Sequence, residues 1–241
     1  MSLPQAWLDN LIAFANKPDQ NLGRAELGPS LCRITKTSSE HVMHEFFRLD
    51  LRCNEALQRT FVDLGCGRGL VCAAALVHAP CLKRVIGWDI DAREVAWARE
   101  HVSPAANETG GALTQAKVRF EKADAREFCA ARDIFRLYPG PPGEPGALFS
   151  NESVWIYAFW YDWGPQARQT IARHLFLEDG NYWSVFACSD GPDRTDLFKL
   201  IADGDEKIYS RLINEFKKVS KVEVKLSGSG RRHTINFYVK K

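Results

Sequence analysis

The segment that most constrains the fold is VDLGCGRG, residues 62–69. It overlaps an apolar run at 60–65 that is typical of a buried strand, and it leads into RGLVCAAALVHA at 68–79, which is rich in helix-forming Ala and Leu. Glycines at such a turn let the chain bend tightly and let a ligand approach the bare backbone. The N-terminus of the helix adds oriented N–H donors. The segment therefore predicts a ligand site at the end of a buried strand.

Strand-like and helix-like segments alternate along the rest of the chain. Strands are expected at 60–65, 83–88, 117–122, in the segment 147–159 and at 181–188, and helices at 4–16, 38–58, 68–79, 91–102, 125–137, 165–178 and 196–218, the last one broken near Gly204. The end reads VEVKL, a Ser-Gly-Ser-Gly turn and HTINFYV, which predicts a hairpin. Such alternation is typical of an α/β fold with a mostly parallel twisted sheet, here with an antiparallel terminal hairpin. We expect an N-terminal helical extension, 1–58, that covers the ligand cleft, and one ligand-binding domain, 59–241.

Composition excludes several other classes. The 241 residues are 45% hydrophobic and 11% aromatic, which supports a dense core and disfavours a disordered chain. No apolar stretch approaches the roughly 18 residues of a membrane span, and no secretory signal is expected. The seven cysteines are odd in number, include no Cys-x-x-Cys pair and form no cluster with zinc spacing. We therefore expect free, buried thiols in a reducing compartment and no metal.

Carboxylates follow three successive predicted strands. Asp63 lies within the glycine segment, Asp89 ends the second strand, and Asp124 follows the third. An acid at the second strand end can accept both hydroxyls of a ribose, and one at the third can accept the amine of an adenine. Asp91 could replace Asp89 in this role, and Asp124 could instead be a helix cap. The glycine spacing is G-x-G-x-G rather than the G-x-G-x-x-G of dinucleotide sites, and Asp63 suits a cationic ligand better than a pyrophosphate.

On these residues the sequence resembles the class I S-adenosylmethionine-dependent methyltransferases. VDLGCGRG matches their first motif, IGWDID at 86–91 the second, and EKADAREF at 121–128 the third. The resemblance implies a Rossmann-like methyltransferase fold with S-adenosyl-L-methionine as cofactor. It places the cofactor on Asp63, Gly65, Cys66, Gly67, Gly69, Asp89, Ile90, Asp124 and Ala125. A nicotinamide-binding oxidoreductase, or an α/β protein with an incidental glycine turn, remains an alternative.

An aromatic run follows at residues 155–163, WIYAFWYDW. In this fold, strand ends at the carboxyl edge line the active cleft, and aromatic walls there could desolvate an amine or attract a cation. We take Tyr157, Trp160 and Tyr161 as candidate catalytic residues. The alternative is that members of this run only pack the core between the sheet and its helices.

A narrower resemblance concerns the acceptor. Thr37-Ser38-Ser39 ahead of a helix, the glycine segment, the aromatic run leading into Gly164-Pro165 and the Ser-Gly hairpin are similar to the disruptor-of-telomeric-silencing family of histone lysine methyltransferases. This resemblance adds Thr37 to the cofactor site. It implies transfer to a protein lysine such as a nucleosomal histone lysine, in the nucleus or the cytoplasm. No Asp/Asn-Pro-Pro-Tyr/Phe motif and no Pro-Cys nucleophile follows the fourth strand, which disfavours methylation of an adenine amine or of cytosine carbon 5.

Charge is distributed unevenly along the chain. Residues 207–241 hold ten Lys and Arg against two acids, a net of +8, whereas the rest of the chain carries −6. This asymmetry predicts a polyanionic partner, and a nucleosome, with this basic end facing DNA, would supply one. The alternative is a solvated surface. The alternatives for function are methylation of RNA or a small molecule, or a methyltransferase-fold partner subunit with weak catalysis.

Overall fold

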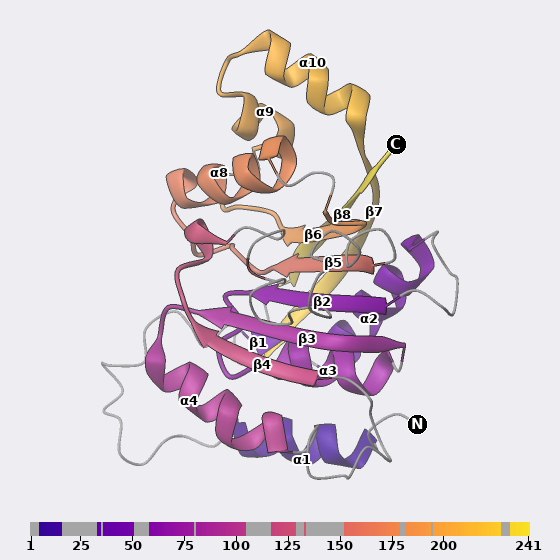
Figure 1. Cartoon of the computed structure of the whole chain (residues 1–241), viewed down its shortest axis with the longest axis vertical. Helices are drawn as coiled ribbons and strands as arrows, with labels where there is room; N and C mark the ends of the chain where they lie inside the picture. The colour runs from indigo at the N-terminus through magenta and orange to yellow at the C-terminus, as the bar shows by residue number, and fades with distance from the viewer. Residues whose placement is uncertain are drawn as a thin grey trace, which may run out of the picture.

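The computed structural model describes residues 5–15, 33–34, 36–50, 58–79, 81–104, 117–128, 133, 152–178, 182–193, 195–227 and 232–241. These residues form a twisted β-sheet with helices on both faces, as Figure 1 shows. The α/β prediction is confirmed.

The sheet has eight strands among the described residues, in the order β1-β7-β8-β6-β5-β2-β3-β4. The strands are β1 Arg33–Ile34, β2 Gln58–Leu64, β3 Leu82–Asp89, β4 Lys117–Lys122, β5 Glu152–Ala158, β6 Val185–Ser189, β7 Phe216–Ser227 and β8 Arg232–Lys240. Strands β2 to β6 are parallel, whereas β8 runs antiparallel between β6 and β7. The predicted antiparallel terminal hairpin is therefore confirmed.

One face of the sheet packs against four helices that come early in the chain. They are α1 Gln5–Ala15, α2 Lys36–Leu49, α3 Leu70–His78 and α4 Ala92–His101. Every buried residue of α3 is apolar, as its Ala- and Leu-rich sequence predicts. Phe46 of α2 stacks on Trp155 of β5 with ring centroids 5.6 Å apart, and it also contacts Phe61 and Phe237. The extension therefore shares one core with the sheet.

The opposite face packs against the later helices, α8 Pro165–Arg173, α9 Leu197–Ala202 and α10 Glu206–Glu215, which gather at the upper end in Figure 1. A π-helical turn, η3 His174–Glu178, extends α8. Phe176 in this turn contacts the rings of Trp183, Phe186 and Phe216. This second core fixes α8, which borders the site described below.

A buried carboxylate ties α2 to the start of the sheet. Asp50, just after α2, accepts hydrogen bonds on one oxygen from Arg59 at 3.0 Å, Ser153 at 2.9 Å and the indole of Trp155 at 3.0 Å. Arg59 and Ser153 lie at the amino ends of β2 and β5, and Trp155 lies in the middle of β5. The C-terminal end of α2 thus lies far from the carboxyl edge of the sheet, where the predicted ligand cleft would be.

Three predicted helices differ from the structure. The helix expected at 38–58 ends at Leu49, and Gln58 begins β2. The expected helix 125–137 begins with a 3-10 turn, η2 Ala125–Glu127, after which Phe128 adopts extended backbone and buries its ring on Trp88. Beyond Phe128 the structure describes only Asp133 of this predicted helix. The helix expected to run through 218 ends at Glu215, since Phe216 is extended and buried and begins β7. The break near Gly204 is confirmed, with Asp203 and Gly204 both at positive φ. Within the described ranges no helix is long and apolar enough to cross a membrane.

Candidate functional site

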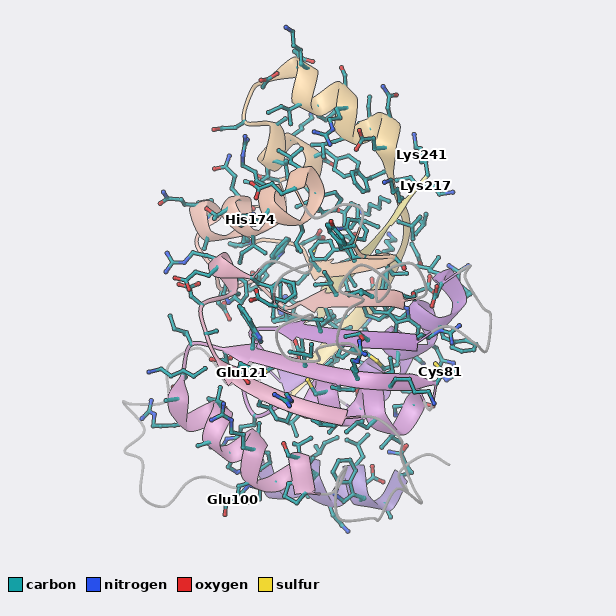
Figure 2. All side chains as sticks on the ribbon, in the orientation of Figure 1. Cys81, Glu100, Glu121, His174, Lys217 and Lys241 are labelled. Atoms are coloured by element: carbon teal, nitrogen blue, oxygen red, sulfur yellow. The ribbon has the colours of Figure 1, made fainter. Side chains whose placement is uncertain are left out.

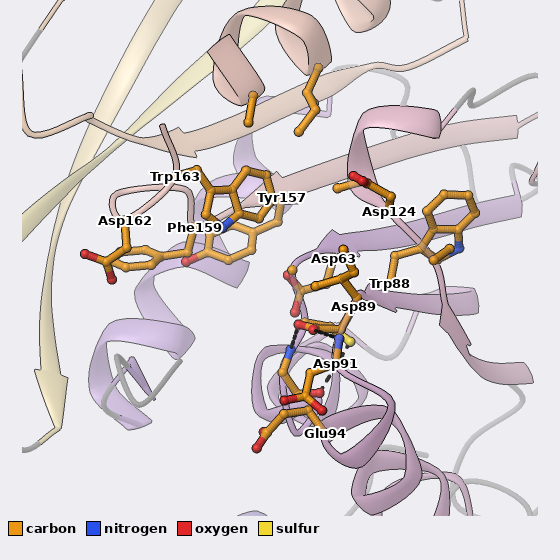
Figure 3. A pocket seen from close by; sticks show the side chains of 18 of the residues that line it. Asp63, Trp88, Asp89, Asp91, Glu94, Asp124, Tyr157, Phe159, Asp162 and Trp163 are labelled. Carbon is orange, nitrogen blue, oxygen red and sulfur yellow. Dashed lines mark hydrogen bonds between the residues drawn. The ribbon is translucent and has the colours of Figure 1, made fainter. Parts of the chain in front are cut away.

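A cavity of about 580 Å³ opens at the carboxyl ends of β2, β3, β4 and β5. Figure 3 shows its wall, with Asp63, Asp89, Asp91 and Glu94 on one side and Tyr157, Phe159, Asp162 and Trp163 on the other. The helices α3, α4 and α8 begin at this edge and contribute further lining residues. Parallel α/β sheets place ligand sites at this edge.

The glycine turn forms the floor of the cavity between β2 and α3. The backbone N–H groups of Gly65 and Cys66 both donate to the carbonyl of Trp88, at 2.7 and 2.9 Å, which joins the turn to β3. Gly65 and Gly69 have φ of 79° and 70°. A Cβ at Gly65 would lie 2.5 Å from the ring of Trp163, and one at Gly69 would lie 2.6 Å from that of Phe120. Both positions therefore require glycine for conformation and for space.

Asp89 is held at the rim by two backbone donors. One carboxylate oxygen accepts from Gly67 N–H at 2.8 Å, and the other accepts from Asp91 N–H at 2.8 Å. Asp91 also lines the cavity, but its side chain caps α4 and pairs with Arg93. The geometry therefore favours Asp89 over Asp91 as the acid that faces a ligand. Ile90, beside Asp89, lines the cavity with 64% of its surface exposed.

Asp124 both caps a turn and lines the cavity. Its carboxylate accepts from the backbone N–H of Arg126 at 2.9 Å and pairs with the Arg126 guanidinium. Hydrogen bonds from Arg126 hold the pKa of Asp124 below its ordinary value, so the carboxylate stays ionised. The cap and the predicted ligand role are therefore compatible. Ala125 lines the same wall.

Asp63 is the buried acid of the site, with 2% of its surface exposed. The thiol of Cys72 donates to it at 3.8 Å. Burial, with a smaller contribution from the nearby Asp89, raises the pKa of Asp63 to about 8. A cation bound beside this carboxyl would favour its ionised form. Cys66 lines the cavity as well, and burial raises the pKa of its thiol, which disfavours a thiolate.

Of the three candidate catalytic residues, only Tyr157 lines the cavity. Its side chain is 1% exposed, and its hydroxyl has no hydrogen-bond partner among the described residues. Trp160 is instead a core residue, whose indole donates to the carbonyl of Ser189 at 2.5 Å. The ring of Tyr161 lies against His233, with centroids 4.3 Å apart, and is not part of the wall. The structure therefore moves Trp160 and Tyr161 out of the candidate site.

One cofactor candidate, Gly69, lies off the wall, and the side chain of another, Thr37, is not among the described ones. Gly69 shapes the turn but does not line the cavity, and α2, the helix that contains Thr37, contributes no lining residue. The described parts of α1 and α2 therefore do not form the expected cover over the cleft.

Several lining residues were missed by the sequence reasoning. They come from the loop after β5 and the inner face of α8, and from the first turns of α3 and α4: Phe159, Asp162, Trp163, Gly164, Ala167, Ile171, Arg68, Leu70, Val71 and Glu94. The signal for the first group was Gly164-Pro165, a helix start directly after a strand end. That start places the first turns of α8 beside the cavity.

Acidic side chains outnumber basic ones around the cavity. Six acids line it: Asp63, Asp89, Asp91, Glu94, Asp124 and Asp162. The two lining arginines both face acids, since Arg68 lies 3.5 Å from Glu94 and Arg126 pairs with Asp124. The wall therefore favours cationic or neutral groups and disfavours phosphates. Across the described part of the chain, no cluster of His, Cys, Asp and Glu could hold a metal ion.

Known structures share this architecture. The O-methyltransferase from Bacillus cereus, solved in complex with SAH, aligns with TM-score 0.52 at 12% identity over 99% of this chain and 92% of that one. The chain has a Rossmann-like methyltransferase fold. The METTL16 methyltransferase domain aligns with TM-score 0.53 at 11% identity, over 85% of this chain and 68% of that one.

Other comparisons limit what this methyltransferase fold implies. TrmN from Thermus thermophilus aligns over 90% of this chain at 17% identity with TM-score 0.47, and this chain spans only 51% of its length. No family model and no curated protein matches the sequence. The structural matches do not support the narrower resemblance to the disruptor-of-telomeric-silencing family.

Proposed function

We propose that this protein is an S-adenosylmethionine-dependent methyltransferase that acts on an RNA or a small molecule. The observation that carries the proposal is the set of carboxylates at three successive strand ends, Asp63, Asp89 and Asp124, around one cavity. S-adenosylmethionine is a cation that carries a ribose and an adenine. Carboxylates suit its charge, its hydroxyls and its amine.

The residues present fit this cofactor. Asp63 is buried with a weak thiol donor as its hydrogen-bond partner, so a cationic amine would satisfy it. Asp89 retains acceptor capacity beyond its two backbone donors and faces the rim, where a ribose would lie. Ile90 offers an apolar surface beside it for a flat ring.

When bound, the cofactor supplies a methyl group that is already activated by its positive sulfur. The chain then needs mainly to align the acceptor with that methyl group. The half-buried rings of Phe159 and Trp163 narrow the cavity and exclude water from it. Tyr157 lines the same cavity and offers its hydroxyl to the acceptor. No covalent bond to a side chain is required, and the protonated thiol of Cys66 would be a poor nucleophile.

The aromatic wall supports a flat acceptor. Phe159 and Trp163 can stack on a base or on an aromatic metabolite, and the surrounding acids exclude phosphates from the cavity itself. The acceptor would thus enter as an uncharged ring.

A protein lysine is the second candidate acceptor. The same rings and Asp162 would attract an ammonium group and, by desolvation, favour its neutral form. A nucleosome as partner and a nuclear location belong to this candidate. A partner subunit with weak catalysis is the third candidate.

Two measurements test the proposal. Calorimetry should show binding of S-adenosylmethionine, and a tritium-methyl transfer assay should label RNA or a metabolite extract. Label on histones or nucleosomes would instead select the second candidate. Binding without any transfer would favour the partner subunit, and no binding to the folded protein would refute the proposed function.

A further inference from the structure

The terminal hairpin places a row of basic residues on one face. Residues directly opposite in a β-ladder share a face, and the register pairs Lys218 with Tyr238, Lys221 with Asn236 and Lys225 with Arg232. The β8 partners alternate by two, so they too share a face. The register shift between Lys218 and Ser220 brings Lys218 into this alignment. We call Lys218, Lys221, Lys225 and Arg232 the hairpin stripe.

The hairpin stripe is open to solvent. All four side chains are exposed, although Tyr238 on the same face is buried against Phe176 and Phe198. Glu223 lies among them and approaches Arg232 at 3.4 Å, with both side chains largely exposed. The stripe spans about 20 Å at the usual rise of a strand.

Not all of the basic segment belongs to this surface. Lys217 pairs with Val239, which lies in the core on the opposite face of the sheet. Lys217 and Lys241 lie near the C-terminus of the chain, at the far end of the hairpin from Arg232, as Figure 2 shows. The +8 segment is therefore divided between two faces of the sheet.

One end of the hairpin stripe lies beside the cavity. His233 follows Arg232, and its ring contacts Phe159 at 5.4 Å and Tyr161 at 4.3 Å between centroids. Phe159 is part of the cavity wall. Since Arg232 and His233 are consecutive, the end of the stripe and this aromatic group lie at the same end of β8, with the two side chains on opposite faces of the sheet. The basic surface thus ends close to the acidic cavity.

This division of charge suits one kind of ligand. We propose that the hairpin stripe binds the phosphate backbone of a single-stranded nucleic acid. Phosphates are attracted to the stripe and repelled by the acidic lining of the cavity, whereas an uncharged base is tolerated there. A base can enter the cavity only when it is unpaired, which selects a single strand over a duplex. Aromatic rings beside a basic groove are typical of such binding. The inference rests on the proposed function only in assigning the cavity to the acceptor.

The test measures binding without catalysis. A labelled single-stranded RNA of about 12 nucleotides, the matching DNA strand and their duplex forms would be titrated by fluorescence anisotropy. The variant Lys218→Glu, Lys221→Glu, Lys225→Glu should bind the RNA at least about tenfold more weakly, and its salt slope should fall by about 2, because each lost phosphate contact removes about 0.7. The control variant Lys199→Glu, Lys207→Glu, Lys217→Glu changes the same number of exposed lysines off the stripe. It should bind close to wild type.

Each outcome is decisive. Weakening confined to the stripe variant supports the inference, and the tighter of the RNA and DNA strands identifies the source of the backbone. Equal loss in the control variant, equal affinity for a duplex, or no binding by the wild type at low salt would overturn it. Calorimetry with S-adenosylmethionine is run on both variants. A wild-type protein that binds S-adenosylmethionine but no single strand rejects this inference alone. A wild-type protein that does not bind S-adenosylmethionine rejects the proposed function.

Discussion

The carboxylate of Asp89 accepts a hydrogen bond from the backbone N–H of Gly67 at 2.8 Å, which joins the end of β3 to the glycine turn after β2. The same carboxylate accepts from Asp91 N–H, so both of its oxygens are oriented before any ligand arrives. Such preorganisation lowers the cost of binding, because the acceptor does not need to be ordered by the ligand.

We expect Asp89→Ala to weaken binding of S-adenosylmethionine well over tenfold. Two charge-assisted hydrogen bonds to the ribose would be lost, each worth roughly 1.5–3 kcal/mol and not fully additive. Calorimetry measures the effect, and thermal unfolding checks that the fold survives. Asp91→Ala is the control, because that side chain caps α4, and its affinity should change much less. The reverse order would assign the ribose to Asp91.

Asp63 should make stability depend on pH. Its folded-state pKa is raised to about 8, whereas an unfolded aspartate titrates near 4, so between these values the folded state holds a proton that the unfolded state releases. The free energy of unfolding should fall as pH rises through this window, by up to about 1.4 kcal/mol per pH unit, and level off above it. Urea unfolding of the ligand-free protein measures this slope. The free energy of unfolding of Asp63→Asn should lack this pH dependence, so that it matches the wild-type value near pH 4 and exceeds it at pH 8. Parallel curves for the two proteins would show that Asp63 is ionised in the folded state.

The hydroxyl of Tyr157 should matter for turnover more than for stability. Because it has no partner among the described residues, Tyr157→Phe should leave the free energy of unfolding unchanged or slightly higher. Turnover should fall by about five- to tenfold, which corresponds to the free energy of one hydrogen bond to the acceptor, and cofactor affinity should be unchanged. Trp160→Phe removes the hydrogen bond to the carbonyl of Ser189, so it should lower the free energy of unfolding and leave turnover of the folded protein nearly unchanged. Full activity of Tyr157→Phe would make the hydroxyl a bystander.

No thiol should be essential. Cys66 lines the cavity, but burial keeps its thiol protonated, and direct methyl transfer needs no nucleophile from the chain. Turnover of Cys66→Ala should remain within about twofold of wild type, since the side chain supplies only packing. If turnover disappears while calorimetry still shows cofactor binding, a covalent thiol step exists.

The buried carboxylate of Asp50 should be needed for folding stability and not for the site itself. Asp50→Ala removes the buried carboxylate that pairs with the buried Arg59 and should cost about 3–5 kcal/mol in urea unfolding. Glu45→Ala, which breaks an exposed pair with Arg48 on the same helix, should change stability far less. Comparable effects would mean that the Asp50 network adds nothing beyond an exposed ion pair.

The local parts of the site could be predicted from the sequence by itself. The glycine turn and the acids Asp63, Asp89 and Asp124 each lie within a few residues of a strand end, and parallel strands bring those ends to one edge. The terminal hairpin was equally legible, because alternation and a Gly/Ser turn are local patterns. These features depend on short-range geometry, so neighbouring residues suffice to specify them.

Only the tertiary structure decided which aromatic side chains face the cavity and which basic side chains share one face of the hairpin. Tyr157 faces the cavity because β5 is still in the sheet there, whereas Trp160 lies beyond the strand end and turns into the core toward Ser189. The irregularity near Lys218 changes the alternation along β7, and the insertion of β8 between β6 and β7 sets which end of the basic segment reaches the cavity. Both depend on pairing between residues far apart in the chain, and a shift of one residue would reverse every side chain's face.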